Sequence, residues 1–179
     1  PALFMSKFWM NRVWTWDNCF NALALSSGDL ALAWDQILLA FDHQAPNGML
    51  PDTISDLEAA YGFVKPPVYG WTIRQLIARH GLKRNLPYLK AVYTPLCQLT
   101  EWWCAFRDTD GDGICQYHHG NDSGWDNSTV FDAGYPTESP DLSAWLILQQ
   151  ETLADSAPAA GRARGPARWR DRPAARPPS

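Results

Sequence analysis

The chain has 179 residues, of which 46% are hydrophobic and 13% aromatic, with ten tryptophans and a formal net charge of −4. This length suffices for one domain with a buried core, and no apolar run is long enough to cross a bilayer. The acidic balance disfavours nucleic acid as a partner, and the lack of a signal-peptide pattern favours a cytoplasmic protein.

Hydrophobic periodicity predicts helices and no alternating strand. The expected helices cover residues 16–27, 29–44, 71–80 and 85–107, and a last helix opens at Ser139. Gly28 is placed to cap the first helix and Asp29 to begin the second. Thr94 and Pro95 are a good N-cap and N1 pair, so they are expected to break the fourth.

Two long loops, residues 46–70 and 107–138, separate these helices and hold the polar and aromatic clusters. Long loops in compact domains are usually functional. The pattern therefore predicts an all-α toroid or bundle whose site is built on one rim.

The first cluster lies at the start of the first helix, where Asp17 stands between Trp16 and Phe20. The carboxylate could cap the helix, or it could accept hydrogen bonds from sugar hydroxyls beside a stacking indole. The sequence leaves both interpretations open.

The first long loop carries Asp52 after Asn47-Gly48, and then Lys65, Tyr69 and Trp71 around two prolines and Gly70. These side chains could point into a pocket. A rigid connector that leads into the next helix is the alternative.

The second long loop opens with aspartates at alternate positions, Asp108, Asp110 and Asp112, followed by Gly113. This is the first half of a calcium-loop pattern, although His119 stands where an EF-hand needs a bidentate glutamate. A structural calcium ion would borrow a distant carboxylate, and a plain Asp/Gly turn is the alternative. No other cofactor is required.

Residues 119–129 are the densest cluster, with two carboxylates, two amides, two glycines and a tryptophan in a segment without helical or strand period. Aromatic platforms beside carboxylates suit sugars, because a pyranose offers an apolar C–H face and a rim of hydroxyls. The alternative is an Asx/Gly-rich turn with Trp125 in the core.

Residues 156–179 differ sharply in composition, with six arginines and one aspartate, a net +5 that leaves −9 on residues 1–155. Such an Ala/Arg/Pro tail buries too little to offset its ordering entropy, so disorder and an artefactual origin are expected. The predicted domain is therefore residues 1–155.

Taken together, these segments resemble (α/α)6-barrel glycoside hydrolases, specifically the bacterial members of family 63. The family 37 trehalases are their relatives. The resemblance covers roughly residues 8–154 and rests on five ordered segments: Trp16-Asp17-x-x-Phe20, Asn47-Gly48 to Pro51-Asp52, Lys65-Pro66-Pro67 to Gly70-Trp71, Arg107-Asp108 to Gly113, and Asp122-Ser123-Gly124-Trp125-Asp126-Asn127.

The resemblance implies that Asp126 is the general acid, that Trp16 and Asp17 hold the sugar in the −1 subsite, and that the aspartate turn is a candidate for calcium. It also implies further substrate-binding residues: Phe20, Asp52, Lys65, Tyr69, Trp71, Asp122, Gly124, Trp125 and Asn127. The resemblance implies α-glucosides or related α-glycosides as substrate. Mannosylglycerate-type members carry a tryptophan where this chain has Asn121, a departure that argues against mannosylglycerate itself.

The family inverts the anomeric centre, with an acid on one side of the sugar and a water-activating base on the other. Burial beside Trp125 and repulsion from Asp122 are expected to keep Asp126 protonated. No segment resembles the family's general base, and six helix pairs need about twice this length. We therefore expect about half of a barrel with little activity alone. A non-catalytic, calcium-stabilised sugar-binding or scaffold module is the alternative, and a trehalase is disfavoured because that family's arginine-rich segments are absent.

Overall fold

The computed structural model of the chain describes residues 1–6, 8–162 and 169. The helices are α1 (Asp17–Leu25), α2 (Leu30–Asp42), α3 (Tyr69–His80), α4 (Leu82–Phe106), the short α5 (Gly120–Ser123) and α6 (Pro140–Ser156). A 3-10 turn covers Thr129–Phe131. All the helices predicted from periodicity are present, so the helical class is confirmed.

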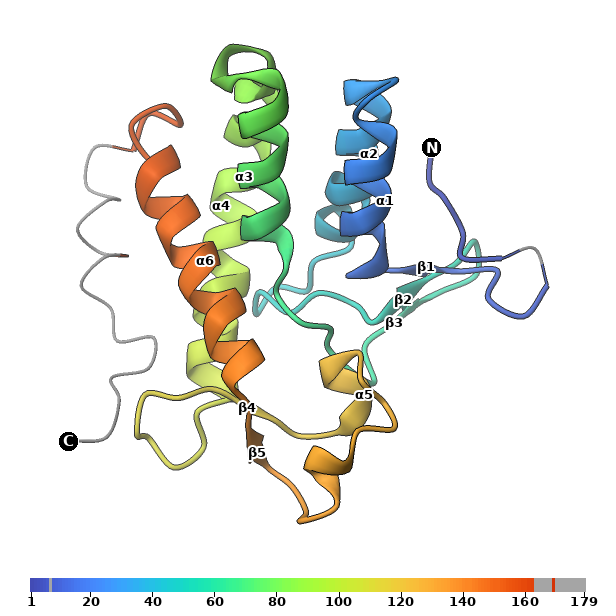
Figure 1. The fold of residues 1–179 in the computed structure, drawn as a ribbon, viewed down its shortest axis with the longest axis vertical. Coiled ribbons are helices and arrows are strands. Elements are labelled where there is room, and N and C mark those ends of the chain that lie inside the picture. Colours follow the sequence, from blue (N-terminus) through green and yellow to red (C-terminus); the bar gives the residue numbers. More distant parts are fainter. Residues whose placement is uncertain (7, 163–168, 170–179) are drawn as a thin grey trace.

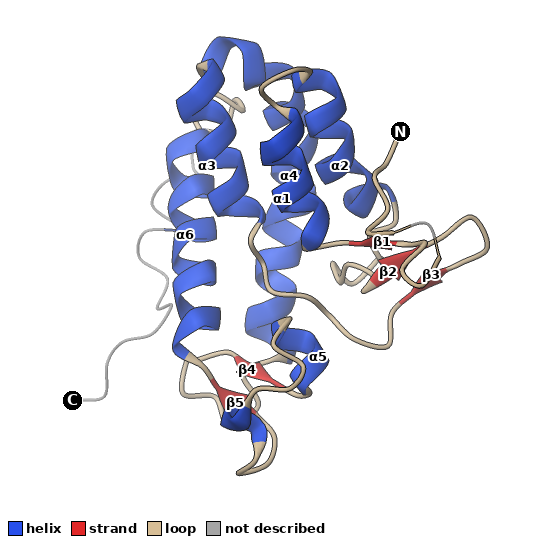
Figure 2. Ribbon diagram, turned by 45° about the vertical axis from the view of Figure 1, so that its right-hand side comes forward, coloured by secondary structure: helices blue, strands red, loops and turns tan. Residues whose placement is uncertain are grey.

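The long helices form two layers (Figure 1). In one layer α1 contacts α3 and α3 contacts α6, while α2 and α4 contact each other behind them. Figure 2 shows α1, α3 and α6 side by side, with the loops and α5 gathered below them. This arrangement of helices in two layers is compatible with part of a helical toroid.

Helix α4 is continuous, so the predicted break at Thr94 and Pro95 is wrong. A proline inside a helix costs about 3 kcal/mol because it removes a hydrogen bond and crowds the preceding turn. Here Val92, Leu96 and Leu99 form one buried face that runs through Pro95. Burial of that face holds the two halves in line.

Two predicted helix ends also differ. Helix α1 stops at Leu25 with Ser26 as its C-cap, so Gly28 does not cap it but lies in the following turn. Asp29 does begin α2, where its carboxylate accepts a hydrogen bond of 3.0 Å from the amide of Leu32.

The prediction that the chain has no strands is wrong, because short strands pair with one another in the loops. Strands β1 (Val13–Trp14), β2 (Thr53–Ile54) and β3 (Ala59–Ala60) form one antiparallel sheet, and β4 (Gln116–Tyr117) pairs with β5 (Thr137–Glu138). Each has two residues, too few for an alternating pattern to be visible in the sequence. These sheets tie the long loops to the helices.

The contact between α3 and α6 is unusually close. A β-carbon built at Gly70 would lie 2.3 Å from the α-carbon of Gln149. The hydroxyl of Thr152 donates a hydrogen bond of 3.0 Å to the carbonyl of Gly70. Only glycine allows this approach, so the relative position of the two helices is fixed here.

At the other end of the chain, α6 ends at Ser156 and residues 157–162 continue in a turn. Ala157 and Trp169 are buried. Residues 163–168 and 170–179, on which most of the predicted disordered tail falls, lie outside the described residues. Within the described part of the chain, no helix combines the length and the hydropathy that crossing a membrane would need.

Candidate active site

The pairing of β1 with β2 places Asp52 beside the start of α1. Trp14 lies opposite Thr53, and the next amide, that of Thr15, donates a hydrogen bond of 3.2 Å to the carbonyl of Asp52. The Thr15 hydroxyl donates to the carbonyl of Pro51 over 2.7 Å. Two segments far apart in the sequence are thereby joined immediately before Trp16 and Asp17.

Tyr69 was predicted to point into the site, but it supports this junction from inside. Its side chain is buried, and its hydroxyl donates a hydrogen bond of 2.9 Å to the carbonyl of Thr15. A phenol that is fully used in the core does not contact a ligand.

Asp17 is the first residue of α1 and not its N-cap, a position that Trp16 holds without a side-chain capping hydrogen bond. The Asp17 carboxylate interacts with the backbone amide of the same residue in the first turn. Because the residue is only partly buried, its carboxylate can also meet a ligand.

Lys65 joins the first long loop to the second. Its ammonium group lies 3.2 Å from a carboxylate oxygen of Asp52 and donates a hydrogen bond to the carbonyl of Asn121. The lysine side chain is only 8% exposed. This contact fixes the segment that precedes Asp126.

Asp122, predicted to bind substrate, is a buried support for the same segment. Its oxygens accept hydrogen bonds of 3.1 Å from the amides of Val64 and His118. The oxygen that accepts from His118 also lies 3.6 Å from the guanidinium of Arg107. With these partners the carboxylate is not free for a sugar, and Arg107 emerges as a structural residue that motif spacing alone did not identify.

The glycines of the second loop are explained by close contacts. Gly124 has a φ of +73°, and a β-carbon there would lie 2.4 Å from Cζ2 of Trp16. A β-carbon at Gly120 would lie 2.9 Å from the carbonyl oxygen of Asp126. The segment that carries Asp126 is thus folded tightly on itself and against the first indole.

The carboxylates of this region act on one another. Burial raises the pKa of Asp17. A hydrogen bond from the Asp17 backbone amide and the positive charge of Lys65 lower this pKa, and the charges of Asp52 and Asp126 raise it further. Burial also raises the pKa of Asp52, again opposed by Lys65 and reinforced by Asp122 and Asp126. The charge of Asp126 thus acts on both Asp17 and Asp52, and Lys65, which pairs with Asp52, is the cation that opposes it.

The expected burial of Asp126 beside Trp125 is wrong. Asp126 and Asn127 are exposed, and the Trp125 side chain is 68% exposed. The alternative prediction, with Trp125 in the core, is wrong for the same reason. Trp125 instead forms one wall of a cavity of about 250 Å³ that also contacts Ser128 and Asp141.

Aromatic rings continue from Trp16 across the inner helices. The rings of Trp16 and Phe20 lie edge to face with centroids 5.6 Å apart, and Phe20 lies 6.0 Å from Trp71. Trp145 on α6 follows, 5.9 Å from Trp71. Trp145 was not predicted as a site residue because its place in a helical stripe looked like core packing.

The aspartate turn is compact. Asp108, Asp110 and Asp112 each offer an oxygen within 4.8 Å of the others. One oxygen of Asp108 accepts from the amide of Gly113 over 3.1 Å, whereas its other oxygen is buried without a hydrogen-bond partner. That oxygen and its neighbours fit a hard cation such as calcium.

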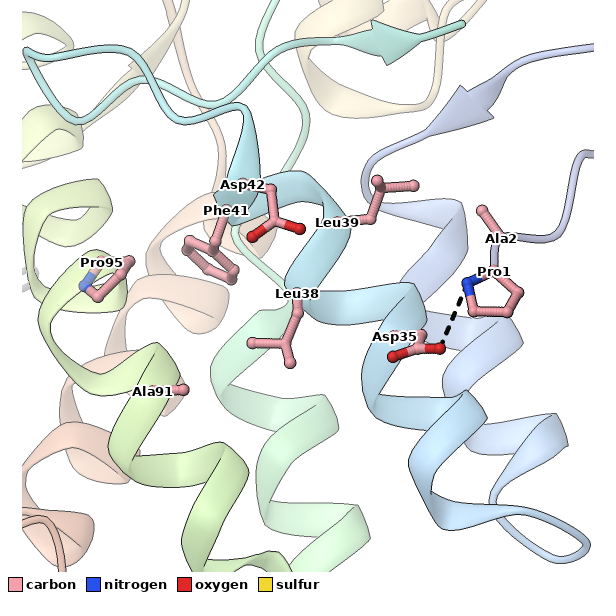
Figure 3. A pocket seen from close by; sticks show the side chains of 9 residues that line it. All are labelled: Pro1, Ala2, Asp35, Leu38, Leu39, Phe41, Asp42, Ala91 and Pro95. Carbon is pink, nitrogen blue, oxygen red and sulfur yellow. Dashed lines mark ion pairs between the residues drawn. The ribbon is translucent and has the colours of Figure 1, made fainter. Parts of the chain in front are cut away.

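A cavity of about 420 Å³ lies elsewhere, between α2 and α4 (Figure 3). Leu38 and Phe41 face Ala91 and Pro95 across it, and Asp35 at its edge pairs with the amino group of Pro1 over 3.3 Å. None of the predicted site residues lines this cavity.

Comparison with known proteins gives one consistent result. A model of the "Mannosylglycerate hydrolase MGH1-like glycoside hydrolase domain" family matches residues 10–176. A mannosylglycerate hydrolase of Thermus thermophilus is 27% identical over 140 residues, which are 66% of this chain and 34% of that protein. Mannosylglycerate hydrolase MGH1 of Selaginella moellendorffii is 22% identical over 138 residues, 66% of this chain and 28% of its own.

Solved structures share the fold. The family 63 mannosylglycerate hydrolase of Thermus thermophilus in complex with glucose has a TM-score of 0.72 at 20% identity, covering 88% of this chain and 55% of that one. The same enzyme with Tris and D-glycerate has a TM-score of 0.74 at 20% identity, covering 89% and 56%. The chain thus spans about a third of the curated relatives and about half of the solved chains. It belongs to the mannosylglycerate hydrolase MGH1-like family of glycoside hydrolases.

Proposed function

We propose that this chain carries the acid side of an inverting glycosidase that acts on small α-glycosides, with Asp126 as the general acid. The observation that supports this most directly is the packing of Gly124, two residues before Asp126, on the Trp16 indole beside Asp17. The negative charge of Asp126 also contributes to the raised pKa of Asp17 and of Asp52, although burial is the chief cause of both.

In this proposal the apolar face of a sugar ring stacks near Trp16, and Asp17 accepts hydrogen bonds from its hydroxyls. Asp126 then protonates the glycosidic oxygen as the bond to the anomeric carbon breaks. Water attacks from the opposite face, which inverts the configuration. In inverting enzymes the two carboxyl groups are about 6.5–9.5 Å apart to leave room for that water.

The water-activating carboxylate is, in this proposal, not among these residues. Asp52 is paired with Lys65, and Asp122 is paired with Arg107. Asp17 is assigned to sugar hydroxyls. The described helices would form about half of a six-hairpin (α/α)6 barrel, and the base would lie on the other half. The chain alone is therefore expected to bind its substrate without hydrolysing it.

For the substrate we propose α-glucosides. Family membership supports a glycoside, and one solved relative was crystallised with glucose. The exposed Trp125 and the partly exposed Trp16 offer indole surface to a neutral sugar.

The decisive substitution is Asp126→Asn in a chain that completes the barrel. Loss of a general acid lowers the rate by about a hundredfold to ten-thousandfold. The substitution should therefore slow hydrolysis of an α-glucoside by a factor in this range while binding of the α-glucoside persists. Hydrolysis at the wild-type rate would refute the assignment of Asp126.

The alternative function is a non-catalytic, calcium-stabilised sugar-binding module. The oxygens of the aspartate turn favour its calcium part, and we propose that Asp108, Asp110 and Asp112 hold a structural calcium ion under either function. The two functions differ in the completed barrel, because a binding module would lose nothing with Asp126→Asn.

A further inference from the structure

Two exposed rings flank the α5 turn, and the proposed function uses neither of them. The rings of His119 and Tyr135 lie parallel, with centroids 5.7 Å apart and an interplanar angle of 6°. His119 also contacts Phe63 of the first long loop, with centroids 4.7 Å apart. Tyr135 stacks on Phe131, whose ring is buried. This series of rings connects the two long loops beside α5.

Each of the two polar side chains also accepts a hydrogen bond from a backbone amide of α5. Nδ1 of His119, the N-cap residue, accepts from the amide of Asn121 over 3.1 Å. The hydroxyl of Tyr135 accepts from the amide of Gly120 over 3.0 Å. The first amides of a helix find no partner within the helix, so these contacts supply one. They therefore fix where α5 begins.

Gly120 links the start of α5 to Asp126. A β-carbon at Gly120 would lie 2.9 Å from the carbonyl oxygen of Asp126 and 3.3 Å from the hydroxyl of Tyr135. The tyrosine hydroxyl and the backbone of Asp126 thus meet at a residue that has no side chain to separate them. The position of the Asp126 backbone therefore depends on where Tyr135 holds Gly120.

The buried contacts of the same segment act before it reaches Asp126. Asp122 is paired with Arg107, and Lys65 binds the carbonyl of Asn121, whereas Asp126 itself is exposed. An exposed acid has to be positioned through its backbone, because a displacement of about 1 Å can cost a hundredfold in rate. The contacts at Gly120 provide such positioning.

We propose that His119 and Tyr135 are positioning residues for the general acid. Their acceptor atoms fix the start of α5, and the close contact at Gly120 transmits this position to Asp126. In this proposal neither residue touches the substrate. The inference rests on the proposed function, because the two residues have this role only if Asp126 is the acid.

The first test follows the backbone amide resonances of this chain by NMR. Tyr135→Phe keeps the ring and removes only the accepting oxygen. The amide resonances of Gly120 and Asp126 should both move. The affinity for methyl α-glucoside should stay within about twofold, since the groups assigned to the sugar ring are unchanged. An Asp126 resonance that stays in place would overturn the proposal.

The matched control is Tyr61→Phe. Tyr61 is 40% exposed, against 47% for Tyr135, and its hydroxyl donates a hydrogen bond to the carbonyl of His43. Its removal should leave the Asp126 resonance where it is in the wild type. An equal movement in both variants would overturn the specific role of Tyr135.

Two substitutions of His119 separate its hydrogen bond from its ring contacts. His119→Asn keeps an acceptor for the amide of Asn121 and loses the ring, because asparagine is a favoured N-cap residue. His119→Phe keeps a ring beside Tyr135 and loses the acceptor. The Asp126 resonance should move in His119→Phe and stay near its wild-type position in His119→Asn. A movement in His119→Asn that is as large or larger would overturn the role of the acceptor atom.

The second test compares two leaving groups in a chain that completes the barrel. Departure of the sugar hydroxyl of maltose needs a proton from the acid, whereas fluoride leaves α-glucosyl fluoride with little need of one. Tyr135→Phe should lower kcat for maltose about tenfold to a hundredfold and leave its KM within about twofold. The kcat for α-glucosyl fluoride should stay within about threefold, which a general loss of structure would not allow.

Comparison with Asp126→Asn separates the two proposals. If Asp126→Asn slows maltose more than α-glucosyl fluoride and Tyr135→Phe slows neither, the positioning role is overturned and the proposed function stands. A variant of Tyr135 that slows both substrates equally also overturns the positioning role. If Asp126→Asn does not discriminate between the substrates, the proposed function fails and the positioning role fails with it.

Discussion

Gly124 and Trp16 are in direct contact, although 108 positions separate them in the chain. The glycine has a φ of +73°, and a β-carbon there would overlap the six-membered ring of the indole. This contact sets the position of the segment that carries Asp126 relative to the segment that carries Asp17. The site therefore depends on a residue with no side chain.

Gly124→Ala should both destabilise the fold and displace the loop. A non-glycine residue at positive φ costs about 1–3 kcal/mol, and the clash with Trp16 adds to this. We expect a lower free energy of unfolding by urea denaturation and a changed Trp16 indole resonance. Gly111→Ala is the matched control, because Gly111 has a φ of +76° and nothing within 4 Å of its β-carbon position. If both variants lose the same stability, the contact with the indole contributes nothing.

Removing the Asp122 carboxylate should be among the most damaging single changes. Asp122→Ala leaves the Arg107 guanidinium and two amides without their partner in a buried region. Breaking a buried pair on one side costs about 3–5 kcal/mol. Thermal or urea unfolding measures the loss.

The control for this change is the exposed pair of Arg12 and Glu58, whose side chains are 37% and 57% exposed. Glu58→Ala should cost less than about 1 kcal/mol. A loss at Asp122 as small as that at Glu58 would show that Asp122 does not hold the loop.

Asp17 gives a pH dependence with a definite sign. Its pKa is raised above the ordinary value of 3.8 in the folded chain, chiefly by burial. The folded state therefore binds this proton more tightly than the unfolded chain does. The protonated Asp17 carboxyl therefore contributes fully to the stability of the fold below pH 3.8. This contribution is lost as the pH rises through the pKa of Asp17 in the folded chain.

It follows that Asp17→Asn should be more stable than the wild type at neutral pH, with the difference closing in acid. Urea midpoints measured across this pH range check it, and Asp132→Asn at an exposed position is the control. A variant that is less stable than the wild type at neutral pH would contradict the sign. The same variant should bind methyl α-glucoside more weakly, which would show that the carboxylate is retained for function at a cost in stability.

Calcium should raise the melting temperature if the aspartate turn holds it. A ligand present at a hundred times its Kd stabilises by about 2.7 kcal/mol. Asp110→Asn should remove most of this gain, because it takes a charge from the ligand set while its exposed position limits other damage. Magnesium serves as the control ion, since it prefers a smaller octahedral site. An unchanged melting temperature in calcium would contradict the site.

Most of the long helices were predictable from the sequence because each has a one-sided apolar pattern, and such patterns are local; α6 was predictable from the Ser139-Pro140-Asp141 start signal. The paired strands were not, because two residues carry no period. Long-range contacts explain the misassigned site residues. Nothing near Asp122 in the sequence indicates that the amide of Val64 and the guanidinium of Arg107 converge on it. Likewise, Tyr69 looks like a pocket residue until Thr15 is seen to accept its hydroxyl.

The choice of Asp126 as the candidate acid depends on both the sequence motif and the geometry of the loop. The resemblance selects it from a segment with two carboxylates, and the structure distinguishes the two by burial. Asp122 is buried and paired, while Asp126 is exposed and follows by two residues the glycine that packs on Trp16. The exposure of Asp126 could not be predicted, because it depends on how the loop folds around Gly120 and Gly124.

A single NMR experiment distinguishes sugar binding from hydrolysis by this chain. The chain is mixed with para-nitrophenyl α-glucoside, and saturation transfer from protein to sugar protons is recorded together with the signals of released glucose. The account predicts transfer to the sugar protons and no accumulation of glucose, because the acid side binds the ring but lacks a base. Absence of transfer would contradict the sugar site, and steady release of glucose would contradict the missing base.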